Sequence, residues 1–165
     1  MIKYPKALEA LIDQFSSLPS VGRKTAERFA FYVYSKMPKE RIELFSDSLV
    51  NLHQQLHSCS CCGNISEEDL CSICKDPERN HKQVLVVEQI KDLITIENVN
   101  EYRGIYHVLG GAISFSKGIG IDDLNLSSLI RKVKNKEVDE LILATNATLE
   151  GETTARYIKE LLQDE

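Results

Sequence analysis

Four cysteines in two pairs constrain this chain more than any other feature of its sequence. Cys59 and Cys62 are separated by two residues, and Cys71 and Cys74 repeat that spacing after a gap of eight residues. A two-residue gap turns both sulfurs of a pair toward one ion, and two pairs complete a tetrahedral all-sulfur site. Thiolate ligands favour zinc over hard cations. The spacing therefore predicts one zinc ion per chain.

The segment around these cysteines, residues 58–80, is polar and has no periodic apolar face. Because so short a piece has no core of its own, a bound metal must hold its shape. Cysteine fills all four coordination positions, so the zinc is expected to be structural rather than catalytic. A redox pair or four buried thiols are the alternatives, and the doubled spacing argues against both. Cys61, the fifth cysteine, is expected to be a plain thiol on the solvent side.

The first 57 residues predict a small helical unit. Apolar residues recur at helical spacing over residues 7–15, a second helix is expected over residues 23–35, and a third begins near Pro38. The third helix carries an apolar stripe made by Ile42, Phe45, Leu49, Leu52 and Leu56.

A short turn of polar and small residues, residues 16–22, joins the first two helices. Together with the start of the second helix it resembles the helix-hairpin-helix motif, whose turn presents backbone N–H groups to a DNA phosphate. The resemblance assigns the DNA contact to Val21 and Gly22 in the turn and to Lys24 and Arg28 on the following helix. Such contacts touch phosphates and no base edges, so binding would not depend on sequence. An ordinary helical turn with solvated basic residues is the alternative.

From residue 81 onward the pattern changes to alternating strands and helices. Buried strands are predicted over residues 84–87, 104–109 and 140–145, with helices over residues 126–133 and 153–162. This alternation predicts an α/β layer with a mainly parallel sheet. The expected fold class is α+β multidomain, with a helical unit, a zinc module and an α/β domain at residues 1–57, 58–80 and 81–165.

Acidic and polar residues follow the first and the last of these strands. Glu88 ends the first strand, and residues 144–152 lead from the last strand into a helix. This pairing resembles the Toprim domain of topoisomerases and primases, in which a glutamate and an Asp-x-Asp pair hold magnesium for phosphoryl transfer. The matching pair in this chain is Asn146 and Thr148. Since neither carries a charge, the clamp on a hard cation is lost.

Four carboxylates remain near this edge of the sheet, because parallel strands place their sites at their carboxyl ends. They are predicted to converge as an acidic patch that docks a basic partner surface: Glu88, Asp92, Glu150 and Glu152. For Glu150 and Glu152, the simpler interpretation is a helix N-terminus that favours acidic side chains.

The order of helical hairpin, four-cysteine module and degraded Toprim domain closely resembles the RecR family of bacterial recombination mediators, over essentially the whole chain. The resemblance implies a non-enzymatic protein of recombinational DNA repair that binds double-stranded and gapped DNA. It implies that RecO and RecF are partners, with the acidic patch against RecO, and that the protein helps load the recombinase at single-stranded gaps. It also implies a homo-oligomer, either a dimer or a tetrameric ring.

Three positions and the length depart from the family's pattern. Family members usually have glycine at the position of Ser20 and proline at those of Arg23 and Ala147. Their chains continue past the helix that ends near Gln163 with another strand and a glycine-rich tail that helps close a ring, whereas this sequence ends at Glu165. The resemblance therefore supports pairing of the helical units more than closure of a ring.

Charge and hydropathy bear on the competing functions. The net charge is −5, yet residues 1–57 hold eight basic and six acidic residues, so a DNA contact is expected there. A Toprim-type, magnesium-dependent phosphoryl-transfer enzyme is one alternative, and the neutral Asn146 and Thr148 argue against it. A zinc adaptor that binds only protein is the other, favoured by the negative charge. Without an apolar run of membrane length or a signal peptide, a cytoplasmic protein with no membrane partner is expected.

Overall fold

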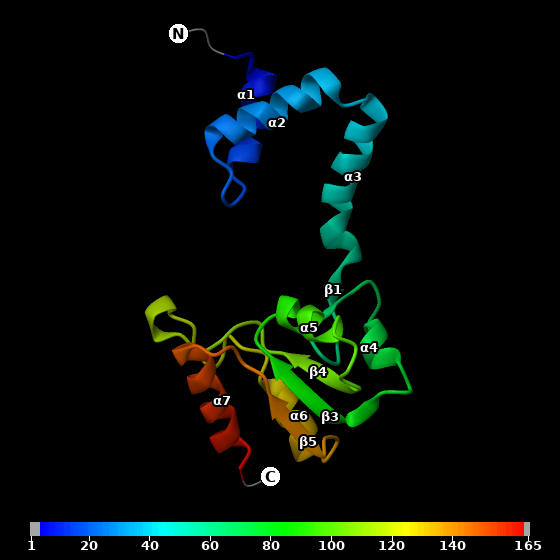
Figure 1. Cartoon of the computed structure of the whole chain (residues 1–165), viewed down its shortest axis with the longest axis vertical. Helices are drawn as coiled ribbons and strands as arrows, with labels where there is room; N and C mark the ends of the chain where they lie inside the picture. The colour runs from blue at the N-terminus through cyan, green and yellow to red at the C-terminus, as the bar shows by residue number, and fades with distance from the viewer. Residues whose placement is uncertain (1–3, 164–165) are drawn as a thin grey trace. The chain divides into compact units, whose positions relative to one another are not determined.

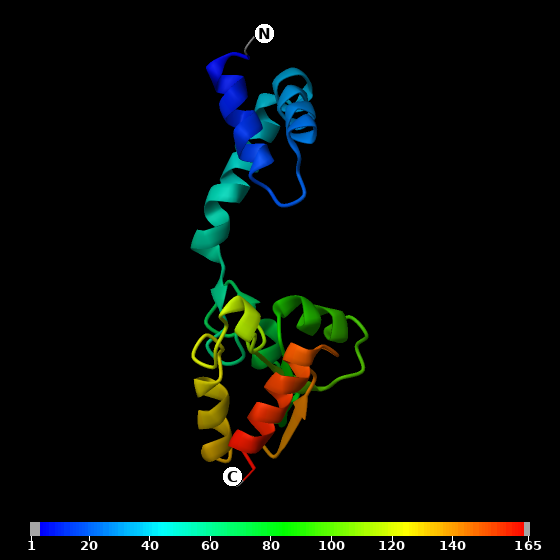
Figure 2. The ribbon, with the colours of Figure 1, turned by 90° about the vertical axis from the view of Figure 1, so that its left-hand side faces the viewer.

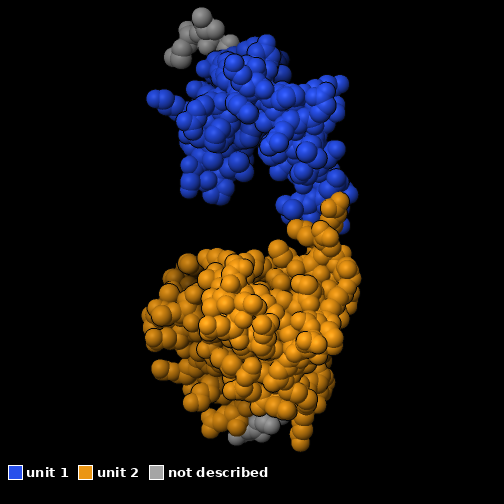
Figure 3. Space-filling view, turned by 45° about the vertical axis from the view of Figure 1, so that its right-hand side comes forward, with its two compact units in different colours: residues 1–54 blue, residues 55–165 orange. Residues whose placement is uncertain are grey.

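The chain forms two units in the computed structural model, which describes residues 4–163. Residues 1–54 belong to the first unit and residues 55–165 to the second, and Figure 3 shows the two in different colours. Helices make up the first unit, and a three-stranded parallel sheet with the cysteine-rich segment makes up the second. This confirms the mixed fold class. The predicted limits of the three domains, 1–57, 58–80 and 81–165, stay a prediction.

Helices α1 (Lys6–Ser16) and α2 (Arg23–Lys36) pack against each other to form the core of the first unit (Figure 1). Ile12 of α1 and Ala26 and Ala30 of α2 are fully buried between them. Alanine at both contact positions of α2 leaves room for the larger side chains of α1. The partly buried residues around this centre are Leu8, Leu11, Phe15 and Val21.

Helix α3 (Lys39–Gln55) carries the predicted apolar stripe except for Leu56, which follows its end, and buries none of its residues within the chain. Leu49 is 59% exposed and Leu52 is 50% exposed. A helix of this kind usually turns its apolar side toward a core. The stripe of α3 is thus an apolar surface that the single chain leaves uncovered.

The second unit is built on a sheet with the strand order β4-β3-β5, in which both neighbours run parallel to the central strand. The strands are β3 (Asn80–Val87), β4 (Gly104–Val108) and β5 (Glu140–Leu143). Val84 to Val87 are all buried, because both faces of the central strand are covered. This covering explains the continuous apolar run from which the strand was predicted.

Helices cover both faces of this sheet (Figure 1, Figure 2). Helix α5 (Ile90–Glu97) and the cysteine-rich segment lie on one face, where Leu85, Tyr106 and Val108 point. Helices α6 (Ser127–Lys134) and α7 (Leu149–Leu161) lie on the other, with Val84, Val86 and Ile105. Alternate side chains of each strand therefore belong to two separate apolar clusters.

Short elements complete the second unit: β1 (His57–Ser58), β2 (Ile65–Ser66), α4 (Ser72–Lys75) and the 3-10 helix η1 (Phe115–Lys117). Helix α7 begins four residues before the predicted position. The hydroxyl of Thr148 accepts a hydrogen bond from the Gly151 N–H at 3.0 Å and caps this earlier start. Within residues 4–163, no helix is both long and apolar enough to cross a membrane.

Candidate functional site

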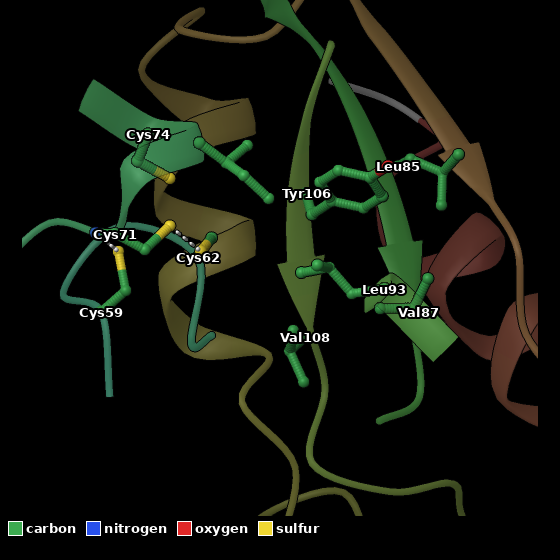
Figure 4. Packing of buried hydrophobic residues seen from close by; sticks show 10 residues of the cluster. Cys59, Cys62, Cys71, Cys74, Leu85, Val87, Leu93, Tyr106 and Val108 are labelled. Carbon is green, nitrogen blue, oxygen red and sulfur yellow. Dashed lines mark hydrogen bonds between the residues drawn. The ribbon is translucent and has the colours of Figure 1, made fainter. Parts of the chain in front are cut away.

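The four paired cysteines gather into one buried cluster (Figure 4). All four sulfur atoms lie within 4.8 Å of one another, and the sulfurs of Cys62 and Cys71 are 3.6 Å apart. Tetrahedral zinc with Zn–S bonds of about 2.3 Å requires sulfurs roughly 3.8 Å apart. The donor set and its spacing therefore fit one zinc ion.

Backbone hydrogen bonds shape the loops that carry these sulfurs. The N–H of Gly63 donates to the carbonyl oxygen of Cys59 at 2.9 Å, and Gly63 has φ +77°, which favours glycine. The N–H of Cys71 donates to the sulfur of Cys59 at 3.3 Å. A hydrogen bond with Cys74, together with one from the Asn64 N–H, lowers the pKa of Cys62 to about 6. A thiolate is the form that binds metal.

The cysteine cluster is part of the apolar core on its face of the sheet. Cys62 and Cys74 share a buried cluster with Leu93 of α5 and Tyr106 of β4 (Figure 4). The carbonyl oxygen of Cys62 accepts a hydrogen bond at 2.8 Å from the N–H of Val108, where β4 ends. A zinc ion bound by the four cysteines would therefore stabilise the packing of the cysteine-rich segment against this face of the sheet.

A buried lysine, which the sequence did not single out, ties the cysteine-rich segment to α6. The ammonium nitrogen of Lys132 lies 2.5 Å from the carbonyl oxygen of Cys61 and 3.3 Å from its sulfur. The side chain is only 7% exposed, and no carboxylate pairs with it among the described residues. The expectation that Cys61 is a plain thiol on the solvent side is therefore wrong, because Cys61 is partly buried and its sulfur contacts Lys132 and Cys74. The buried cation lies beside a centre that four thiolates around Zn²⁺ would make negative.

Replacing Lys132 by methionine is expected to lower the free energy of unfolding by about 1.5–3 kcal/mol, because a hydrogen bond to a charged group is lost. Zinc should also pass faster to a chelator, since the loop that carries Cys62 loses its tie to α6. Arg131→Met, one residue away and exposed, is the matched control. Urea unfolding and the rate of zinc release measure both effects. Equal behaviour of the two variants would contradict the role of Lys132.

The structure places the predicted DNA-binding residues at the turn between α1 and α2. Val21 contributes packing and not a donor, because its N–H is bonded to the carbonyl oxygen of Leu18 at 3.1 Å. Gly22 is the N-cap residue of α2 and has extended backbone angles. A Cβ added at Gly22 would meet nothing within 4 Å, so no neighbour in the chain requires glycine there. The assignment of Val21 and Gly22 to the DNA contact stays a prediction.

The basic side chains at the start of α2 differ in whether they form ion pairs with acidic residues. Arg23 forms ion pairs with Glu9 and Asp13 of α1 and so joins the two helices. Lys24 and Arg28 are exposed, and neither forms an ion pair among the described residues. Two cations without an ion-pair partner thus flank a helix N-terminus whose first N–H groups have no partner within the helix.

Ser20 occupies the position where glycine was expected, and it has φ +65°. This is the left-handed region, in which a residue with a Cβ is strained and glycine is not. The turn therefore keeps the backbone shape that glycine would allow, although serine stands in its place.

Polar groups meet at the carboxyl ends of β3 and β5. Glu88 is buried, and its two carboxylate oxygens accept hydrogen bonds from Asn146, one from the backbone N–H at 2.8 Å and one from the side-chain amide at 2.7 Å. Asp92 accepts a hydrogen bond from the N–H of Gln89 and caps α5. Asp92 and Glu150 are partly exposed and Glu152 is exposed. Burial separates Glu88 from these three carboxylates, and their role as an acidic docking patch stays a prediction.

Gly151 allows the N-terminus of α7 to approach Glu88. A Cβ there would lie 2.1 Å from the carbonyl oxygen of Asn146 and 2.7 Å from Oε1 of Glu88. Gly151→Ala is expected to cost roughly 1–3 kcal/mol of unfolding free energy through overpacking. Urea unfolding measures this loss, and Gly22→Ala, which meets no atom, should cost only the roughly 0.5 kcal/mol by which alanine is a poorer N-cap than glycine. A Gly151→Ala protein as stable as the parent would contradict the close approach.

These features define a class of protein: a Toprim-fold protein with a four-cysteine zinc module and a helical hairpin unit. Comparison with protein families finds each part in the expected order. The matches are a RecR helix-hairpin-helix model at residues 8–53, a RecR four-cysteine zinc finger domain at residues 56–76 and a Toprim domain at residues 82–165. The prediction of one zinc per chain is thereby confirmed.

Relatives similar over nearly the whole chain carry the name recombination protein RecR. The protein from Limosilactobacillus reuteri is 47% identical over 164 residues, which cover 99% of this chain and 82% of the relative. Those from Enterococcus faecalis and Lacticaseibacillus casei are 45% and 47% identical, over 98% of this chain and 81% of each relative. The chain belongs to the RecR family, and its relatives' name supports a role in recombination and repair.

Proposed function

We propose that this chain is a non-enzymatic recombination mediator that binds double-stranded and gapped DNA through its helical hairpin. The observation that carries the proposal is the presence of two cations without an ion-pair partner, Lys24 and Arg28, beside the free N-terminus of α2. Helix N-termini bind phosphates through their N–H groups and dipole. The open space at Gly22 lets a phosphate approach the backbone. Together these groups suit a DNA backbone and read no base.

Two or three phosphate contacts on a chain of net charge −5 give weak binding by themselves. Several hairpins on one assembly would add as avidity, because the second contact becomes intramolecular. We therefore propose that the working form is a homo-oligomer, a dimer or a tetrameric ring. Solution mass, measured by light scattering at micromolar concentration, tests this. A monomer at all concentrations would contradict it.

Apolar surface on the first unit supports self-association. Besides the uncovered stripe of α3, this unit has a cavity of about 650 Å³ with a mainly apolar lining. Tyr34 at its rim is 81% exposed. A second copy of the chain, which carries the same stripe and the same cavity, can cover both. The other lining residues are Tyr4, Pro5, Ala7, Leu8, Leu11, Phe31, Val33 and Ile42.

We also propose RecO and RecF as partners, with RecO docking on the acidic first turn of α7. Glu152 is exposed and Glu150 is partly exposed, whereas both carboxylate oxygens of Glu88 accept hydrogen bonds from Asn146. A basic face would be attracted to this turn. Glu150→Lys should weaken binding to RecO roughly tenfold, about 1.4 kcal/mol, and leave zinc content unchanged. Unaltered affinity in calorimetry would move the docking surface elsewhere.

One assay separates the mediator from both alternatives. The protein is incubated with a labelled gapped duplex and magnesium chloride, and both retention and integrity of the DNA are measured. A mediator retains the DNA at low salt and leaves it intact, in support of loading the recombinase at gaps. Magnesium-dependent cleavage or nucleotide transfer would indicate a Toprim enzyme. No retention at any salt concentration would indicate a zinc adaptor that binds only protein.

A further inference from the structure

We propose that the side-chain amide of Asn146 takes the place of a divalent cation at the carboxyl end of the sheet, so that this Toprim centre is closed without metal. The inference goes beyond the proposed function and does not depend on DNA binding. It concerns the contact between Glu88, which follows β3, and Asn146, which follows β5. These two segments are 58 residues apart in the chain and meet because β3 and β5 pair in parallel.

Both oxygens of the Glu88 carboxylate are used within the protein. Oε1 accepts a hydrogen bond from the backbone N–H of Asn146 at 2.8 Å, and Oε2 accepts one from the side-chain amide nitrogen of Asn146 at 2.7 Å. An ionised carboxylate only accepts hydrogen bonds, so the Asn146 atom that faces it must be the NH₂ group. Glu88 is 7% exposed, so these bonds are largely shielded from water. The amide supplies the positive end of a dipole where a cation would supply charge.

The other groups at this edge do not fit magnesium either. Mg²⁺ requires oxygen ligands in near-octahedral geometry. Asn146 presents N–H groups toward Glu88, and the hydroxyl of Thr148 is bound to the N–H of Gly151. The N-terminus of α7 fills the adjacent space, since a Cβ on Gly151 would lie 2.7 Å from Oε1 of Glu88. The residues that would hold the ion in a metal-binding Toprim centre hold one another instead.

One substitution, at Asn146, tests whether the amide takes the place of a cation. Asn146→Asp replaces the NH₂ group with an oxygen and places a second carboxylate opposite Glu88. Two facing carboxylates repel unless a cation lies between them. The variant should therefore depend on a divalent cation for the contact between the ends of β3 and β5, whereas the natural chain should not.

The test is thermal unfolding of the full chain with and without magnesium chloride, with calorimetry to detect Mg²⁺ binding. The natural protein should show no shift in melting temperature. Asn146→Asp should melt roughly 5 °C lower without magnesium, regain most of this loss with it, and bind the ion. The swapped double variant Glu88→Gln with Asn146→Asp restores one amide and one carboxylate. It should unfold near the parent's temperature and ignore magnesium.

Three outcomes would overturn the proposal. The first is Mg²⁺ binding by the natural chain that Glu88→Gln abolishes, because the carboxylate would then be open to a cation. The second is an Asn146→Asp protein as stable as the parent and indifferent to magnesium. The third is a swapped variant that is as unstable as Asn146→Asp or fails to fold. Gapped-DNA binding, measured on the same samples, should be equal in all variants. Loss of DNA binding in every sample would contradict the proposed function and would leave the inference about Asn146 unaffected.

Discussion

Replacing Cys62 by serine is expected to abolish stable zinc binding and to loosen the second unit. Cys62 is fully buried, and its sulfur is 3.6 Å from that of Cys71. Structural zinc sites bind their ion with roughly 10–16 kcal/mol, and loss of one thiolate removes a substantial share of that energy. The cysteines also form part of the core beneath β4, so the loss should spread to the sheet. Metal analysis and urea unfolding measure the two effects.

Cys61→Ser is the matched control for this substitution. Cys61 lies next to Cys62 in sequence and is not one of the four clustered cysteines, although its sulfur forms a hydrogen bond with Cys74. Its carbonyl oxygen, which no side-chain change removes, keeps the contact with Lys132. Zinc content should stay at one per chain, and stability should fall only slightly. Freshly purified protein with substantially less than one zinc, or a Cys62→Ser variant that retains it, would contradict a structural zinc site.

Reversing the charge of Lys24 or Arg28 is expected to weaken DNA binding on the order of tenfold, about 1.4 kcal/mol, for each residue. The loss should be the same for all sequences, because the contacts are with phosphates. Both side chains are exposed, so Lys24→Glu and Arg28→Glu should fold normally. Fluorescence anisotropy with labelled gapped duplexes of different sequence measures the change.

Lys36→Glu separates a local contact from a general effect of charge. Lys36 is exposed at the opposite end of α2, and its reversal changes the net charge by the same amount. It should reduce affinity much less than the two substitutions at the turn. Gly22→Ala should act like the turn variants without any change of charge, because its methyl group would occupy the space left for a phosphate. Equal losses for Lys24→Glu and Lys36→Glu would show that the hairpin is not the DNA surface.

The parts of the fold that depend on local spacing could be predicted from the sequence. Two cysteine pairs fix a tetrahedral site by their spacing alone, and the apolar run at residues 84–87 indicates a strand buried on both faces. The start of α7 lies four residues before the position that the sequence predicts. Its first turn holds Gly151, a poor helix former, and the sequence pattern does not show that Thr148 caps the helix.

Contacts between distant segments could not be predicted. Lys132 and Cys61 are 71 residues apart, and a lysine on an amphipathic helix gives no sign that it is buried. The sequence shows that Asn146 lacks a charge, but its contact with Glu88 follows from the register of β3 and β5. The same register buries Glu88 and removes it from the expected acidic patch.

At the hairpin, sequence resemblance identified the turn but not the role of each atom. The resemblance could not show that the N–H of Val21 is already bonded to Leu18, or that Arg23 is paired with acidic residues of α1. These contacts depend on how α1 and α2 pack. They leave Lys24 and Arg28 as the available cations beside the N-terminus of α2.

The salt dependence of gapped-DNA binding by the unaltered chain tests whether the hairpin binds DNA through phosphate contacts. Binding constants are measured across a series of salt concentrations, and their logarithm is plotted against the logarithm of the salt concentration. With two or three phosphate contacts per hairpin, affinity should fall with a slope of about −2 to −3 for each engaged chain. Retention at low salt that is lost along this slope is the predicted result. No binding at low salt, or binding that salt does not weaken, would contradict DNA binding through phosphate contacts at the hairpin.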